Sequence, residues 1–415
     1  MNIYGVIILA ALIGRFVVDL ISELLNARSL TMELPEEARN LYDAQRYRRS
    51  QQYTATRSKF HLFESAFGLA VLLLFWFGGG FNRFDFIVRS WEFSPVLTGV
   101  LYIGILVMAT DLLAIPFSLY STFVIEERFG FNRTTPATFL TDRLKTLFLL
   151  TILGAPLLAA ILWFFQYAGS WAWLYCWIVA SLFVLVVQFV APAWIMPLFN
   201  KFIPLQNGEL KDAISDYART VNFSFKDIFV VDGSRRSTKP NAFFAGFGKS
   251  KRIALFDTLV AENSVPEIVA VLAHEVGHYQ MKHVLKMMAL SFVHLGLVLY
   301  LLSFFITSKG LFSAFFMDHI SIYAGLLFFG LLFEPISFAL SILLHLFSRK
   351  HELQADRYAV ETTENSEHVI SALKKLSVKS LSNLTPHPFY VFLNYSHPPL
   401  LNRVRAIQNL PSGTH

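Results

Sequence analysis

Residues 267–307 read EIVAVLAHEVGHYQMKHVLKMMALSFVHLGLVLYLLSFFIT, and a polar, histidine-containing half runs directly into an apolar half. The apolar half, residues 285–307, is long enough to cross the roughly 30 Å hydrocarbon layer of a bilayer as a helix. The polar half contains His274, Glu275 and His278, residue types that bind metal ions or transfer protons. The segment therefore predicts reactive side chains directly beside a membrane span.

Six further apolar stretches of similar length lie on either side of this segment. They cover residues 3–25, 62–81, 96–120, 147–168, 171–195 and 322–347. Of the 415 residues, 54% are hydrophobic and only 15% are charged, and the mean hydropathy is +0.49. This composition excludes a disordered chain and an ordinary cytosolic enzyme. We expect an α-helical integral membrane protein with seven transmembrane helices in a lipid bilayer.

Basic residues in the loops predict the orientation of these helices. Seven arginines and lysines lie between positions 27 and 60, whereas the loop after the second span has only Arg83 and Arg89. Short loops rich in such residues face the cytoplasm, so we expect the polar segments 196–284 and 348–415 on the cytoplasmic side as well. The net charge of +6 has the same explanation, and we expect no nucleic-acid partner.

The spans divide the chain into four parts. Residues 1–195 are a membrane domain with the first five transmembrane helices, and residues 285–347 add the sixth and seventh. Between them, residues 196–284 change in character, since DIFVVD (227–232), NAFFAGF (241–247) and RIALF (252–256) are strand-like runs separated by turn-forming residues. We expect a small α/β catalytic subdomain here and a C-terminal helical segment over residues 348–415.

The pattern HEVGH indicates a metal site on a helix. Ser264 and Glu267 form a capping-box pattern that starts a helix expected to continue through residue 286. On that helix His274 and His278 lie on one face and can bind one ion, while Glu275 is spaced to act as a general base. We therefore expect one Zn²⁺ per chain. Because the chain has only one cysteine, histidine and carboxylate side chains are the expected ligands. The alternative is two surface histidines on an amphipathic helix.

The third metal ligand is expected directly after the seventh span. There SRKHELQADRYAV predicts a helix with Glu352 and Asp356 on one face. Glu352 is the expected ligand, and Asp356 is spaced to accept the other N–H of a ligating imidazole. His351 points about 100° away from Glu352 and is rejected as a ligand. The alternative is an exposed acidic pair matched with neighbouring arginines.

Several separated motifs, in order along the chain, resemble the type I CAAX prenyl protease family of integral-membrane zinc metallopeptidases. They are FVIEERFGFNRTT (123–135), TKPNAFFAGFGKSKRIALFDTL (238–259), HEVGH (274–278), HELQAD (351–356) and SHPPLLNRVRAI (396–407). The resemblance implies a ring of seven long helices around a large water-filled chamber, with the zinc site at its cytoplasmic end. It also implies cleavage of peptide bonds near the C-terminus of prenylated substrates.

The resemblance extends to two residues of the tail motif. It implies that His397 stabilises the oxyanion of the tetrahedral intermediate, and that Arg403 braces the acidic residues of the site. The alternative for His397 is a loop histidine held between Ser396 and Pro398. Without the resemblance, nothing in the residues favours His397 over His387.

An extended peptide substrate is expected to pair with an edge strand beside the metal. The segment 241–247 is the candidate, and Asn241, Phe243 and Ala245 are its predicted substrate-binding residues. The alternative, for Phe243 and Phe244, is that these aromatic side chains form the hydrophobic face of a small sheet. The expected partner is a peptide or protein substrate, isoprenylated or not.

Three functions remain open at this point. The favoured one is a zinc endopeptidase that cleaves prenylated C-termini or, alternatively, acts in membrane-protein quality control with no prenyl requirement. An intramembrane protease of the site-two class would place HExxH inside a span, whereas polar residues flank it here. A channel or transporter with a structural zinc is the third. A compact chain without a dilysine signal favours the bacterial inner membrane, with the endoplasmic reticulum expected for a eukaryotic source.

Overall fold

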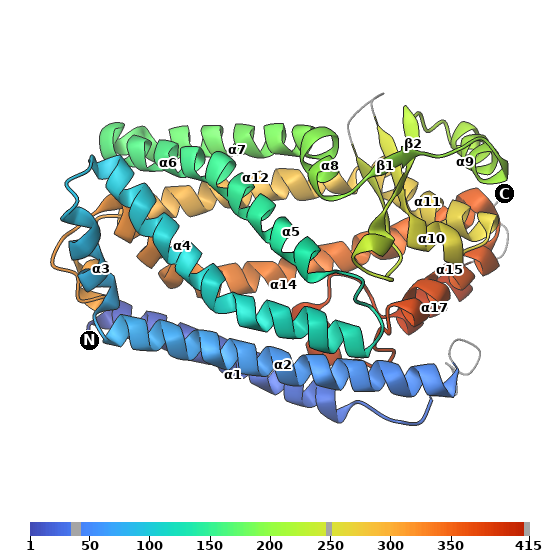
Figure 1. Cartoon of the computed structure of the whole chain (residues 1–415), viewed down its shortest axis with the longest axis horizontal. Coiled ribbons are helices and arrows are strands. Elements are labelled where there is room, and N and C mark those ends of the chain that lie inside the picture. Colours follow the sequence, from blue (N-terminus) through green and yellow to red (C-terminus); the bar gives the residue numbers. More distant parts are fainter. Residues whose placement is uncertain (35–42, 246–250, 411–415) are drawn as a thin grey trace.

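The computed structural model describes residues 1–34, 43–245 and 251–410. Within these ranges, seven helical segments are long and apolar enough to cross a membrane: Ile3–Arg28, Ala44–Phe77, Pro95–Glu126, Pro136–Tyr167, Gly169–Phe199, His283–Phe305 and Ile322–Thr363. The seven predicted spans are therefore confirmed, although several of their bounds differ from the predicted ones. Figure 1 shows these helices running along the long axis of the molecule.

Four of the segments are single helices and three contain π-helical turns. The single helices are α1 (Ile3–Arg28), α2 (Ala44–Phe77), α12 (His283–Phe305) and α14 (Ile322–Thr363). The others are α4 (Pro95–Tyr120) with η2 (Ser121–Glu126), α5 (Pro136–Leu149) with η3 (Leu150–Gly154) and α6 (Ala155–Tyr167), and η4 (Gly169–Trp171) with α7 (Ala172–Val190), η5 (Ala191–Ile195) and α8 (Met196–Phe199). Pro156 lies two positions after the end of η3, and Pro192 lies within η5. Because proline has no N–H for the helical ladder, it favours such local irregularity.

The second helix begins much earlier than predicted. Helix α2 starts at Ala44, inside the stretch 27–60 that was expected to be a loop. Its start is capped by Asp43, whose carboxylate accepts hydrogen bonds from the backbone N–H groups of Gln45 at 2.8 Å and Arg46 at 3.4 Å. The first turns of α2 are rich in arginine and glutamine. Hydropathy marks only the apolar half of such a helix, so the predicted boundary was wrong.

The seventh span and the predicted helix after it are one continuous element. Helix α14 has 42 residues, which corresponds to a length of about 63 Å. This is about twice the thickness of the hydrocarbon layer, so α14 extends well beyond the span at residues 322–347. The same helix therefore carries Glu352 and Asp356 to the opposite end of the molecule from its start (Figure 1).

One end of the molecule is closed by two short helices, α3 (Gly80–Arg89) and α13 (Lys309–Ala314), next to the N-terminus (Figure 1). The hydrophobic core at this end consists largely of aromatic rings. Phe315 is fully buried and stacks on Phe328, with ring centroids 4.0 Å apart, and on Trp76 at 4.6 Å. The Trp76 indole N–H also donates to the Ala314 carbonyl at 2.8 Å.

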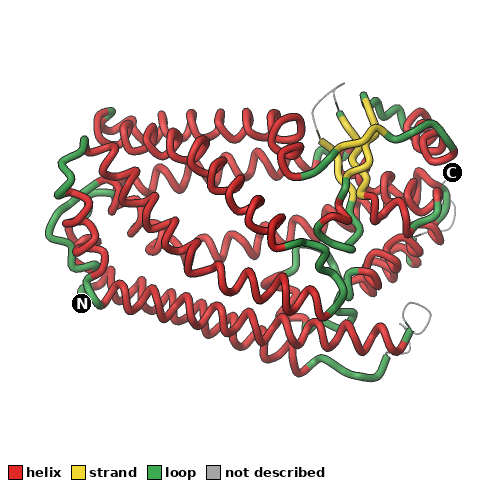
Figure 2. Tube along the Cα trace, in the orientation of Figure 1, coloured by secondary structure: helices red, strands yellow, loops and turns green. Residues whose placement is uncertain are grey.

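The opposite end carries a four-stranded sheet in the order β1-β2-β4-β3, and Figure 2 shows the strands gathered there. The strands are β1 (Phe202–Pro204), β2 (Asp227–Val231), β3 (Ala242–Ala245) and β4 (Arg252–Phe256). Strands β2 and β4 are parallel, with Ile228 opposite Ile253, and the two outer strands pair antiparallel to them. Three strands occur where predicted, while β1 was not expected. Residues 246 and 247 of the predicted third run lie outside the described residues.

Helices cover the sheet and complete this end of the molecule. They are α9 (Glu209–Thr220), η6 (Gly233–Arg235), α10 (Asp257–Glu262), α11 (Val265–Gln280), α15 (Ser366–Lys379), α16 (Pro388–Asn394) and α17 (Leu400–Gln408). Buried apolar side chains of the sheet, including Ile253 and Leu255, share a core with Ile268 and Val276 of α11. The helix predicted to continue to residue 286 is instead broken at Lys282, whose φ of 57° lies in the left-handed region.

Candidate metal centre

Helix α11 is held firmly at its start. The predicted capping box is present, with the Ser264 backbone N–H donating to Glu267 Oε2 at 2.8 Å. The Glu267 carboxylate also accepts from Ser371 and Lys375 of α15, each at 2.6 Å. Farther along, a Cβ added at Gly277 would lie 3.2 Å from a backbone atom of α14. Glycine therefore allows the histidine-bearing part of α11 to pack closely against α14.

The three expected metal ligands converge at this helix contact. His274 Nε2 and His278 Nε2 lie 3.1 Å apart. Glu352 Oε2 lies 3.4 Å from His274 Nε2, and Glu352 Oε1 lies 3.3 Å from His278 Nε2. Two imidazole nitrogens and one carboxylate in one group form the ligand set of catalytic zinc sites, which keep a fourth position open.

The surroundings of these ligands favour a cation. Glu352 is only 5% exposed, and within the described part of the chain its Oε2 atom accepts no hydrogen bond, while Arg403 Nη1 lies 3.6 Å from it. A buried carboxylate oxygen without a partner is costly, and a metal ion would satisfy it. Burial alone lowers the pKa of His274, but the adjacent carboxylates of Asp356 and Glu352 raise it to about 9. The donor set and its electrostatics therefore both fit a divalent metal ion.

A carboxylate and a guanidinium lie behind the first histidine. His274 Nδ1 is 2.9 Å from Asp356 Oδ1. Arg403 of α17 donates to both oxygens of Asp356, from Nε at 2.7 Å and from Nη2 at 2.5 Å. An Nδ1–H group that donates to a carboxylate leaves the lone pair of Nε2 available to a metal. The structure thus brings together both supporting residues expected from the sequence.

Glu275 lines a cleft whose walls also include the ligands His274 and Glu352. The cleft has a volume of about 220 Å³ and includes Asn241, Glu352 and His397 in its walls. Burial raises the pKa of Glu275, while the neighbouring His274 and His278 oppose this shift. A carboxylate beside the ligands and with a raised pKa is suited to accept a proton near neutral pH.

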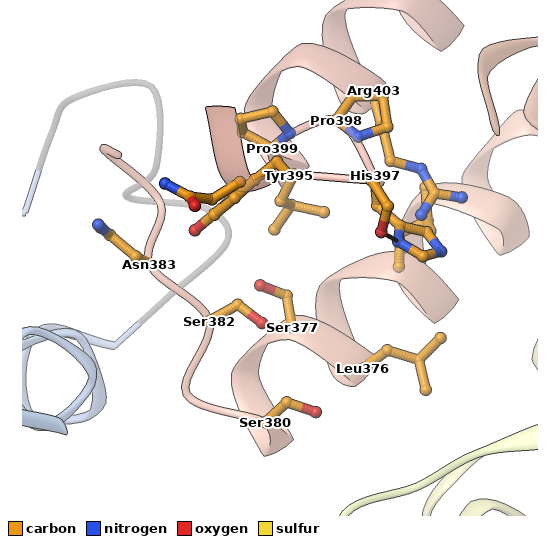
Figure 3. Close-up of a pocket in the computed structure, with 14 residues that line it drawn as sticks. Leu376, Ser377, Ser380, Ser382, Asn383, Tyr395, His397, Pro398, Pro399 and Arg403 are labelled. Atoms are coloured by element: carbon orange, nitrogen blue, oxygen red, sulfur yellow. Dashed lines mark hydrogen bonds between the residues drawn. The ribbon is translucent and has the colours of Figure 1, made fainter. Parts of the chain in front are cut away.

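His397 reaches the centre from the loop before α17. Its Nε2 atom lies 3.3 Å from Glu352 Oε1, and its Nδ1 atom lies 2.9 Å from Ser396 Oγ. The side chain is 64% exposed, so it faces the cleft rather than the core. An adjoining pocket of 450 Å³ shares His397 and Arg403 with the cleft. Figure 3 shows these two residues on one side of that pocket, opposite Ser382.

Comparisons with known proteins agree with this geometry. Residues 23–201 match the model of the CAAX prenyl protease N-terminal region with five membrane helices, and residues 204–410 match the model of peptidase family M48. CAAX prenyl protease 1 of Saccharomyces cerevisiae is 34% identical, covering 90% of this chain and 88% of that protein. The CAAX prenyl protease 1 homolog of Arabidopsis thaliana is 41% identical, covering 72% and 70%. The crystal structure of S. mikatae Ste24p superposes with a TM-score of 0.93 at 32% identity, covering 98% of this chain and 99% of that one.

The chain belongs to the CAAX prenyl protease family. It is a multi-pass membrane metalloendopeptidase of the Ste24 type. The predicted family, fold class and enzyme class are thereby confirmed. Membership in a metallopeptidase family also implies a metal, for which His274, His278 and Glu352 are the fitting residues.

The protease carries an edge strand beside its cleft, as expected for peptide binding. Strand β3 lies at the end of the sheet order and pairs only with β4 among the described strands. Of the predicted substrate-binding residues, exposed Asn241 lines the cleft together with Ala242. Phe243 contacts the Phe256 ring instead, with centroids 6.2 Å apart. Ala245 lies at the far end of β3, opposite Arg252.

One polar residue at the centre of the protease was not anticipated. His283, the first residue of α12, lies behind His278, with its Nδ1 atom 3.1 Å from His278 Nδ1. His351, rejected as a ligand, stacks on His283 at 4.0 Å between ring centroids. A third histidine five positions after HEVGH was the available signal, but the turn at Lys282 that brings it back is not visible in the residue types.

Proposed function

We propose that this protease uses one Zn²⁺ per chain, held by His274, His278 and Glu352. The observation that carries this proposal is the convergence of two imidazole Nε2 atoms and a buried carboxylate within 3.1 to 3.4 Å of one another. The single cysteine, Cys176, is buried in α7 and leaves a histidine and carboxylate ligand set. Such a set with one open position is typical of catalytic zinc.

The residues around the ligands supply the acid–base chemistry of peptide hydrolysis. When bound, zinc acidifies a water molecule and polarises the scissile carbonyl. Glu275 takes the proton of the attacking water and delivers it to the amine that leaves. Asp356, itself held by Arg403, keeps His274 in the tautomer that presents Nε2 to the metal.

His397 supplies the donor for the oxyanion. The ring lies in the cleft wall with Glu275 and Glu352, and its Nε2 atom is near the ligand carboxylate at 3.3 Å. An imidazole N–H in this position can donate to the carbonyl oxygen as negative charge develops on it. The exposed ring favours a residue that contacts substrate over one that packs in a core.

The substrate is proposed to be a membrane-associated peptide cleaved near an isoprenylated C-terminus. The names of the relatives, CAAX prenyl protease 1, support this specificity. The peptide would add by backbone hydrogen bonds to the edge of β3 that pairs with no described strand, with Asn241 contacting it in the cleft and Phe243 and Ala245 farther along. The alternative is quality control of membrane proteins with no prenyl requirement.

The metal centre is proposed to face the cytoplasm. The basic N-terminal part of α2 lies toward the end of the molecule that carries the sheet (Figure 1), and the positive-inside rule assigns such segments to the cytoplasmic side. The four-part domain division of the chain and the bacterial inner membrane stay predictions. The relatives named above come from eukaryotes.

Zinc content and cleavage of a matched peptide pair test this function. We expect the detergent-purified protein to contain about one zinc per chain and to cleave a farnesylated peptide much faster than the same peptide without farnesyl. Equal cleavage of both peptides would favour the quality-control alternative. A protein that cleaves neither peptide and binds no zinc would refute the proposal.

A further inference from the structure

The second metal ligand, His278, has two consecutive hydrogen bonds behind it. His278 Nδ1 lies 3.1 Å from His283 Nδ1, and His283 Nε2 lies 3.1 Å from Gln354 Oε1. His283 is only 2% exposed, so its two ring nitrogens depend on these protein partners rather than on bulk water. These hydrogen bonds therefore link a metal ligand on α11 to α12 and α14.

A backbone turn and two side chains of α14 hold His283 in this position. Lys282, with a φ of 57°, ends the path of α11 and starts α12 in a new direction, so that His283 returns beneath His278. The His351 ring of α14 stacks on His283 with an interplanar angle of 11°. Gln354 extends from the same helix as the third ligand, two positions after Glu352.

The direction of each hydrogen bond follows from Gln354, the last residue in this series of hydrogen bonds. An amide oxygen can only accept, so His283 Nε2 carries the proton and donates to Gln354 Oε1. In a neutral imidazole the other nitrogen, His283 Nδ1, is then an acceptor. It accepts from His278 Nδ1–H, which leaves the lone pair of His278 Nε2 facing His274 and Glu352.

We propose that His283 and Gln354 are positioning residues that fix the tautomer and ring orientation of His278 for the metal. This inference rests on the proposed zinc site. The pair corresponds to Asp356 and Arg403, which support His274, but it carries no formal charge.

The environment explains why this second support is neutral. His278 and His283 border a pocket of 590 Å³ whose walls include Val187, Met287 and Phe292 of the membrane-spanning helices. An ionised carboxylate beside such an apolar surface would pay a large desolvation cost. A neutral imidazole and an amide fix the same proton without that cost.

Zinc binding by the full-length protein in detergent tests the proposal. The probe is Zn²⁺ alone, and its dissociation constant is measured by competition with a chromophoric chelator. We expect His283→Leu to weaken zinc binding by roughly 10 to 100-fold, the usual loss when a ligand's supporting partner is removed. His283→Asn should restore most of the affinity, because its Oδ1 atom can accept from His278 Nδ1 as the imidazole does.

The second residue and a matched control complete the test. Gln354→Glu keeps an acceptor and should bind zinc at least as tightly as the wild type, whereas Gln354→Leu should bind more weakly. His345→Leu is the control, since it removes another ring of α14 that is hydrogen-bonded, to the Leu393 carbonyl at 2.9 Å, away from the centre. It should leave the zinc affinity unchanged.

Thermal unfolding of the metal-free variants separates positioning from packing. Positioning predicts that His283→Leu and His283→Asn unfold at similar temperatures but differ in zinc affinity and in the absorption spectrum of bound Co²⁺. The proposal is overturned if the two variants bind zinc equally, whether as well as the wild type or equally poorly. A wild-type protein that binds no zinc would refute both this inference and the zinc site, whereas loss of peptide cleavage alone would count only against the proposed function.

Discussion

Aromatic rings fill the end of the molecule that carries α3 and α13, whereas hydrogen-bonded charged groups surround the ligands at the end that carries α11. At the first end, Phe315 is fully buried between Phe328 and Trp76. At the second, Asp356 is buried and accepts hydrogen bonds from Arg403 while it faces His274. The packing of aromatic rings does not depend on protonation, whereas the hydrogen bonds around the ligands depend on which atom carries each proton.

This difference suggests that the two ends have separate tasks. The long helix α14 belongs to both, since it starts beside the aromatic core and carries Glu352 near its other end. Changes at the aromatic end should alter the stability of the fold and spare the chemistry. Changes at the metal end should alter metal binding or turnover and cost less stability.

The largest effect on turnover is expected at Glu275. Replacing Glu275 by Gln removes the proton acceptor but leaves all three ligands, so peptide cleavage should fall by roughly 10² to 10⁴-fold with about one zinc still bound. His278→Ala is the matched comparison, since it removes a ligand and should release zinc as well. Metal analysis and single-turnover cleavage of both variants check this, and loss of zinc from Glu275→Gln would show that Glu275 is a ligand.

The aromatic end should show the opposite behaviour. Phe315→Ala leaves a cavity between stacked rings and should lower the free energy of unfolding by about 3 to 5 kcal/mol. Its turnover per zinc should stay near the wild-type value at temperatures where the protein is folded. Phe316→Ala, at a neighbouring position that is 47% exposed, should change stability by less than about 0.5 kcal/mol. Reduced turnover in folded, zinc-loaded Phe315→Ala would contradict the separation of tasks.

His397 tests whether an exposed residue at the metal end takes part in the chemistry. His397→Ala should keep zinc and substrate affinity but lower the chemical rate by roughly 100 to 1,000-fold, the usual loss for one oxyanion donor. Ser396→Ala removes only the partner of His397 Nδ1 and should have a much smaller effect. If His397→Ala releases zinc, the residue is a ligand, and a change below about threefold would make it a loop residue without a catalytic role.

The ligand group was predictable because two pairs of residues, each spaced four positions apart on a helix, contain it. HEVGH places two histidines on one face of α11, and HELQAD does the same for Glu352 and Asp356 on α14. Each pair depends only on local helix geometry, which spacing in the sequence shows directly. Their meeting across 74 positions could be expected because few other residues could complete the ligand set.

The features that were missed depend on tertiary structure or on weak local signals. Strand β1 has only three residues, too few for an alternating pattern to be recognised. The left-handed residue at Lys282 is neither glycine nor asparagine, so its residue type does not indicate a break. Without that break, the position of His283 behind His278 could not be predicted.

The smallest expected effect concerns Glu267, which holds the start of α11 at the metal end. Burial alone raises the pKa of Glu267, but its hydrogen bonds, first of all to Lys375 and then to Ser371 and Ser264, lower it to about 2. Since the folded-state pKa lies below the ordinary value of 4.5, the ionised carboxylate stabilises the fold fully above about pH 4.5. This contribution should decrease as the pH falls from 4.5 towards 2.

Glu267→Gln removes that charge at every pH. It should cost about 1 to 3 kcal/mol of unfolding free energy at pH 7, a typical value for hydrogen bonds to a charged group. The difference from the wild type should shrink as the pH falls below 4.5, because the wild-type carboxylate then also becomes neutral. Thermal unfolding of the metal-free proteins at a series of pH values measures this difference.

Phe315→Ala provides the comparison from the aromatic end, where no proton is involved. Its deficit in unfolding free energy relative to the wild type should be the same at each pH. A Glu267→Gln deficit that is equally independent of pH would mean that the carboxylate contributes by packing rather than by charge, and that the two ends are stabilised in the same way.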